Sequence, residues 1–239
     1  MTHIVRKYVT SNPIEATFSE DAALISIPQS SESAMVKSDD IFSDISASGG
    51  WLPRLQLMSS NSKPCKDGTF PVNHYALVQG QQFTDLSKSV DILVLDWRPK
   101  AIDMSGDEII TVYDTADSEF KRIQAKADVK DSRFMFGPEY LVYVPSAKQF
   151  ALFFMGSASS RREAPALKAR MQKAATLGVQ MIEGKEFTWA NPAITPCSTP
   201  MDLPAAEAVM EELTKFNNPA KSDIEKIDSG DQPNTGRAR

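Results

Sequence analysis

The sequence has few of the residues from which metal and redox centres are built. Its 239 residues include two cysteines and two histidines. Cys65 and Cys197 stand in the contexts KPCK and TPCS, without the CxxC spacing of a zinc or redox site, and they favour a reducing compartment. With His3 and His74 as its only histidines, the chain excludes a histidine-rich metal site. We therefore expect no metal and no cofactor.

Long apolar segments and an excess of basic residues are missing too. The longest apolar runs are as short as FALFFM at 150–155, and the N-terminal MTHIVRKYVTSNP lacks the apolar core of a secretory signal. The formal net charge is −5, unlike the strongly basic balance of simple duplex-binding proteins, although a mildly basic middle lies between acidic ends. We expect a cytoplasmic protein that does not enter a membrane.

Signatures of nucleotide-binding and catalytic sites are also absent. The sequence contains neither GxxxxGKS/T nor GxGxxG, and neither histidine accompanies a recognisable nucleophile signature. Glu183 and Lys185 imitate the last element of a metal-dependent nuclease motif, but the upstream aspartate is missing. Asp103, Asp107 and Glu108 are consistent with either a cation site or a turn between two strands. We expect a protein that is not an enzyme.

The composition divides the chain into four predicted segments. They are a polar, serine-rich arm at 1–48, a body at 49–200, an amphipathic helix at 201–216 and a disordered tail at 217–239. Within the arm, AALISIP at 22–28 is consistent with a strand added to the body. Asp202 is the predicted N-cap of the amphipathic helix, which the Asn-Asn-Pro sequence at 217–219 ends.

The body is predicted to be mainly antiparallel β. Short runs rich in β-branched and aromatic residues indicate strands at 54–58, 74–78, 90–97, 108–114, 139–145 and 149–155, and an extended stretch at 179–196 turns at Gly184. Helical periodicity predicts helices at 118–128 and 164–177. Because the strands follow one another like hairpins, the pattern favours an α+β fold built on an OB-like small barrel decorated with helices, with a β-sandwich as the alternative.

Aromatic and basic residues occur together where two predicted strands end. Trp97, Arg98 and Lys100 follow the apolar strand ILVL, where they could stack a base and contact phosphates. The alternative is that Trp97 packs over the barrel mouth and the two cations are solvated. Trp51 and Arg54 come from a strand that leads to a polar loop with further lysines, and loops of this kind bind oligonucleotides in OB domains; an ordinary surface loop is the alternative.

The stretch GSASSRREAP at 156–165 places small residues and two arginines before a predicted helix that starts near Ala164. Backbone donors, Arg161 and Arg162 would then face one anion, although a capped helix with solvated arginines explains the same residues. Arg133 stands beside two phenylalanines that are candidates for exposure. The complete set of predicted DNA contacts is Trp51, Arg54, Lys63, Lys66, Trp97, Arg98, Lys100, Arg133, Arg161, Arg162 and Lys168.

Four segments resemble proteins of tailed bacteriophages: GGWLPRLQLMSSNS, DILVLDWRPKAID, FGPEYLVYVPSAKQFALFFMGS and NPAITPC. Their layout is similar to that of phage single-stranded DNA-binding proteins with an OB fold. This resemblance implies a protein of phage DNA replication or recombination that binds single-stranded DNA of any sequence and has no catalytic residues. Such a protein would work in the cytoplasm of the bacterial host together with replication proteins. Whether it forms homo-oligomers is left open.

The end of the chain departs from that family. Phage single-strand binders often end in an acidic tail with an aromatic tip that docks partners, whereas this chain ends in GRAR.

The alternative function is that of a phage structural or host-interaction protein, which would bind another protein and no nucleic acid.

Overall fold

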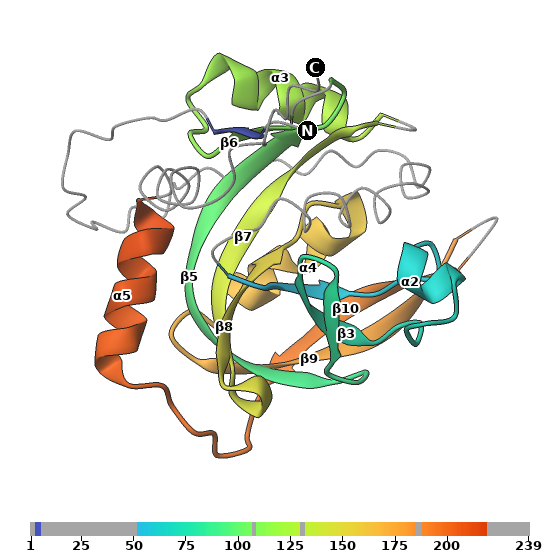
Figure 1. Cartoon of the computed structure of the whole chain (residues 1–239). Helices are drawn as coiled ribbons and strands as arrows, with labels where there is room; N and C mark the ends of the chain where they lie inside the picture. The colour runs from blue at the N-terminus through green and yellow to red at the C-terminus, as the bar shows by residue number, and fades with distance from the viewer. Residues whose placement is uncertain (1–2, 6–51, 107–108, 130–131, 185–187, 219–239) are drawn as a thin grey trace, which may run out of the picture.

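The computed structural model describes residues 3–5, 52–106, 109–129, 132–184 and 188–218 (Figure 1). The predictions for Trp51, for the strand at 22–28 and for residues 219–239 lie outside these ranges, as does the arm apart from residues 3–5. Asp107 and Glu108 lie outside them as well.

The strands of these ranges form one mixed sheet, mostly antiparallel. They are β1 (His3–Val5), β2 (Arg54–Leu57), β3 (Tyr75–Gln79), β4 (Gln82–Asp85), β5 (Val90–Asp103), β6 (Ile109–Val112), β7 (Phe134–Val144), β8 (Gln149–Phe154), β9 (Ala174–Glu183) and β10 (Thr188–Pro196). The order is β1-β6-β5-β7-β8-β2-β3-β4, with β9 on β5 and β10 on β9. Only the β1–β6 and β2–β8 pairs are parallel among the described strands.

The long strand β5 makes the sheet branch and bend. Its first residues, Val90 to Leu93, pair with β9, its last residues, Ala101 to Asp103, pair with β6, and β7 follows its other edge. A bulge between Val94 and Asp96 increases the local twist, and β5 curves strongly in Figure 1. In the described part of the chain no ladder joins β9 or β10 to β2, β3 or β4, so the sheet is open. The α+β class is confirmed, and an OB-like barrel is not.

Side chains, rather than backbone ladders, connect the two ends of the curved sheet. Apolar residues of β2, β3, β5, β7, β8 and β9 form a common buried core with Leu167. Within it the Tyr75 hydroxyl donates a hydrogen bond of 2.8 Å to the Gly178 carbonyl, which links β3 to β9. The curved sheet therefore encloses a core without closing.

The helices differ from their predicted bounds to different degrees. They are α2 (Lys63–Lys66), α3 (Ser118–Ala127), α4 (Ala158–Lys168) and α5 (Ala206–Asn217). The predicted helix at 118–128 is confirmed as α3, which Asp117 caps. The last helix begins at Ala206, after the N-cap predicted at Asp202. None of the helices in the described ranges combines the length and apolarity needed to cross a bilayer.

The prediction of a helix at 164–177 is wrong, because α4 begins earlier and ends earlier. Ser157 caps α4 by accepting from the Ser160 backbone N–H at 3.1 Å, and Pro165 lies inside the helix. Past Lys168 the chain turns and enters β9 at Ala174. The apolar residues that suggested a longer helix are thus divided between a helix and a strand.

Candidate functional site

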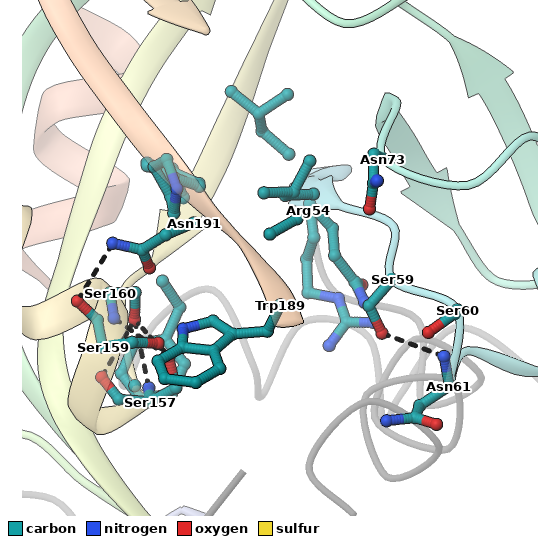
Figure 2. Close-up of a pocket in the computed structure, with 18 of the residues that line it drawn as sticks. Arg54, Ser59, Ser60, Asn61, Asn73, Ser157, Ser159, Ser160, Trp189 and Asn191 are labelled. Atoms are coloured by element: carbon teal, nitrogen blue, oxygen red, sulfur yellow. Dashed lines mark hydrogen bonds between the residues drawn. The ribbon is translucent and has the colours of Figure 1, made fainter. Parts of the chain in front are cut away.

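A cavity of about 510 Å³ opens where β10 and β2 lie near each other without pairing (Figure 2). Its wall combines residues of β2 and the loop that follows it, the end of β8, the start of α4 and the start of β10. The polar lining residues include Arg54, Gln56, Ser59, Ser60, Asn61, Asn73, Glu139, Ser157, Ser159, Ser160, Thr188, Trp189 and Asn191.

The start of α4 contributes three serines to this wall. Ser157 and Ser160 form a reciprocal capping box, in which the Ser157 N–H donates to the Ser160 hydroxyl at 3.2 Å. Asn191 of β10 donates to the Ser159 carbonyl at 3.3 Å and fixes the strand against the helix. Because the positive end of the α4 dipole lies here, this side of the cavity favours negative groups.

Arg54 and Trp189 add a cation and an aromatic ring. Burial lowers the pKa of the Arg54 guanidinium to about 10, against the opposite effect of the Glu139 charge, so Arg54 stays charged at neutral pH. Trp189 is half-buried on β10. Figure 2 shows its indole between the serines of α4 and Arg54. The cavity thus places an aromatic face between two features that attract anions.

Apolar side chains border the same cavity. Val72 is 41% exposed and Met181 52% exposed, and both line its wall. The Asn73 amide donates to the Met181 sulfur at 3.7 Å and connects the loop before β3 to β9. A ligand that covers this rim would remove apolar surface from water.

A buried ion-pair cluster adjoins the cavity through Glu139, which is 1% exposed and lines its wall. Its carboxylate accepts from Arg98 Nε at 2.8 Å and from Lys100 Nζ at 2.5 Å. Burial alone would raise the pKa of Glu139, but the charges of Lys100 and Arg98 hold it at about 2. Burial also lowers the pKa of Lys100, while the Glu139 charge opposes that change. The carboxylate is therefore ionised at neutral pH.

Three of the predicted DNA contacts are engaged within the fold. Arg98 and Lys100 bind Glu139, as described above. Arg161 is 3% exposed and donates to the Gly156 carbonyl at 2.7 Å, to the Phe136 carbonyl at 3.1 Å and to Asp128 at 2.5 Å. These side chains hold elements of the protein together, and a role for them in contacting DNA stays a prediction.

The exposed predicted cations are distributed over four places. Lys63 and Lys66 lie on α2, directly after the Ser59–Asn61 loop that lines the cavity, and Arg162 lies near the start of α4. Lys168 is at the other end of α4, with its ammonium 4.3 Å from the Trp97 ring centroid. Arg133 is exposed just before β7. Arg54 thus lines the cavity, whereas Lys63, Lys66, Trp97, Arg133, Arg162 and Lys168 do not.

Trp189 and Asn191 are not among the residues predicted from the sequence to contact DNA. Both fall in the extended stretch 179–196, and their spacing of two residues places them on one face of a strand. The alternation of side chains along a strand therefore predicts that the two residues share a face. It does not predict which other segment of the chain packs near that face.

Of the acidic set Asp103, Asp107 and Glu108, the structure describes Asp103 alone, and this residue is engaged within the fold. Asp103 is buried, accepts from the Ser105 N–H at 2.8 Å and pairs with Arg122. No cluster of three or more potential metal ligands occurs among the residues that the structure describes.

Comparison with known proteins gives no family to which the chain could be assigned. No protein-family model, no curated protein and no solved structure matches it. Its function therefore has to be inferred from its own residues.

Proposed function

We propose that the protein binds single-stranded DNA in this cavity and performs no catalysis. The observation that carries the proposal is the placement of the Trp189 indole between the guanidinium of Arg54 and the serines that start α4 (Figure 2). Binding of single strands combines these two kinds of group: positive charge for the backbone and aromatic faces for the bases.

In this arrangement the phosphate backbone of the DNA passes Arg54 and the start of α4, and one of its bases stacks on Trp189. Stacking of this kind is worth about 1–3 kcal/mol per base and tolerates any sequence, because every base has a flat face. The exposed lysines of α2 follow the lining loop Ser59–Asn61 in the sequence, and the exposed Arg162 follows the lining Ser160; in this proposal these cations extend the contact along the DNA strand. Bases of a duplex are paired inside the helix, so they cannot reach the indole without unpairing.

The first test is the affinity of the protein for a labelled oligothymidine, measured by fluorescence anisotropy. We expect Trp189→Ala to weaken binding about fivefold to a hundredfold, since it removes one stacking contact. Trp189→Phe retains an aromatic face and should bind close to the wild type. Lys121→Ala serves as a charge control, because Lys121 is exposed on α3, does not line the cavity and is not among the predicted DNA contacts.

Salt and duplex competition complete this test. Affinity of the wild type should fall steeply as salt rises, because counterions are released when phosphates are bound. Unlabelled duplex should compete poorly. The proposal fails if the wild type shows no binding at low salt, or if Trp189→Ala binds as well as the wild type.

A second candidate function is the binding of a protein partner, and the exposed apolar rim favours it. Val72 and Met181 would be covered by such a partner. Protein binding through this rim should depend weakly on salt and should be lost in Met181→Asp, whereas oligothymidine binding should be absent. A place in phage replication or recombination, which the sequence resemblance implies, stays an expectation.

A further inference from the structure

The C-terminal helix α5 covers the face of the sheet opposite to the enclosed core. Leu213 and Val209 pack against the buried residues Leu95, Leu141 and Leu152 of β5, β7 and β8. At the end of the helix Phe216 is fully buried in the same cluster. Figure 1 shows α5 beside β5, at the edge of the molecule.

The last turn of α5 contacts the ion-pair cluster directly. Arg98 Nη1 donates to the Phe216 carbonyl at 2.5 Å, and the Arg98 guanidinium carbon lies 4.2 Å from the centroid of the Phe216 ring. The same guanidinium binds Glu139 through Nε and through Nη2, the latter at 2.6 Å. Since Glu139 lines the cavity, one side chain connects the helix to the cavity wall.

We propose that docking of α5 is coupled to ligand binding in the cavity through Arg98 and Glu139, and that the docked helix favours binding. This inference rests on the proposed function, because it concerns an anionic ligand in the same cavity. Arg98 and Glu139 act here as positioning residues, and Phe216 is the group through which α5 acts on them.

The sign of the coupling follows from charge. With α5 docked, the Phe216 ring and carbonyl hold Arg98 against Glu139 and keep water away from the pair. When α5 leaves, Arg98 loses both contacts and is hydrated, so it neutralises Glu139 less completely. A phosphate in the cavity then meets more of the negative charge of Glu139. By linkage, a bound ligand must stabilise the docked helix by the same factor.

The helix is attached in a way that allows it to dock and undock as a unit. Residues 197–205, which join it to β10, form neither helix nor strand. The side chains of Leu203 and Met210 point into solvent, with 68% and 62% exposure. Undocking α5 therefore breaks the contacts of one helix face and leaves the strand ladders intact.

The test compares two substitutions on α5 by oligothymidine anisotropy in the full chain. We expect Phe216→Ala to weaken binding by about fivefold or more, the usual range of such couplings. Met210→Ala changes an exposed residue of the same helix and should stay within about twofold of the wild type. Equal weakening by both variants, or unchanged affinity of Phe216→Ala, would overturn the inference.

A second measurement needs no variant. Amide hydrogen exchange of residues 206–217 in the wild type should slow when saturating oligothymidine is added. A wild type that binds oligothymidine with unchanged exchange in α5 refutes the coupling and leaves the proposed function standing. A wild type that does not bind at all refutes the proposed function and this inference together.

Discussion

Arg161 and Arg162 are neighbours in the sequence but lie in opposite environments. Arg161 enters the protein and binds two carbonyls and Asp128, whereas Arg162 is exposed on α4. The Arg161 guanidinium carbon lies 4.0 Å from the Phe136 ring centroid. Gly137 leaves room for this arrangement, because a Cβ there would lie 2.1 Å from the Met155 carbonyl oxygen and 3.3 Å from Arg161 Cγ. Sequence spacing alone could not separate these two arginines.

This difference predicts different effects on stability. Arg161→Ala should lower the free energy of unfolding by about 2–4 kcal/mol, since it removes a buried ion pair with Asp128 and leaves two carbonyls without this donor. Arg162→Ala should change it by about 0.5 kcal/mol or less. Urea denaturation followed by circular dichroism measures both. Equal effects of the two substitutions would show that Arg161 does not join the elements as described.

At the scale of the elements, most strands were predictable, but β1, β4 and the first part of β9 were not, and neither was the order of the strands in the sheet. Alternation and β-branched residues located β2, β3, β5, β7 and β8, and turn residues separated them. The boundary between α4 and β9 was misplaced because Leu167 and Leu177 are both fully buried, one on a helix and one on a strand. A run of apolar residues does not reveal where the helical period of 3.6 residues gives way to the strand period of two residues.

The candidate site was less accessible to sequence analysis than the strands. Arg54 was identified because it stands at a strand followed by a polar loop, and it does line the cavity. Trp189 was not, because its neighbours in the cavity come from β2, β8 and α4, which are distant in the sequence. Predicting this meeting would require the order of strands in the sheet, which local patterns do not contain.

The start of α4 gives a prediction for one element. Ser157→Ala removes the hydroxyl that accepts from the Ser160 N–H, and should cost about 1 kcal/mol of unfolding free energy. Ser60→Ala also changes a cavity-lining serine, but Ser60 is exposed and caps none of the described helices, so stability should be unchanged. Thermal denaturation of both variants distinguishes the two cases. A Ser157→Ala variant as stable as the wild type would contradict the capping role.

At the scale of the whole molecule, the cavity lies between β2 and β10, which come near each other without pairing. β2 pairs with β3 and β8, and β10 pairs with β9, so no backbone ladder fills the space between β2 and β10. Here the gap between the two strands carries polar side chains of both, with α4 at one side and the Glu139 cluster behind. The space between β2 and β10 thus forms the cavity, and the buried ion pairs next to it contribute to the stability of its wall.

The ion pairs make the stability of the whole molecule depend on pH. The pKa of Glu139 is about 2 in the folded protein and near 4.5 in its ordinary state, so its contribution is complete above about pH 4.5 and is lost as the pH falls toward 2. The ionised Asp103 likewise contributes stability that is lost as the pH falls. Burial would raise the pKa of Asp103, but hydrogen bonds from Ser105 and Arg122 lower it. We expect the urea midpoint to fall between about pH 5 and about pH 3.

Glu139→Gln isolates the part of this dependence that belongs to the cluster. Without the carboxylate, Arg98 and Lys100 lose their buried partner, so the variant should be about 3–5 kcal/mol less stable at neutral pH. It should also lose less stability than the wild type on acidification, because position 139 no longer takes up a proton. The urea midpoints of both proteins across this pH range provide the measurement. Parallel pH profiles for the two would mean that Glu139 is not the group whose protonation destabilises the fold.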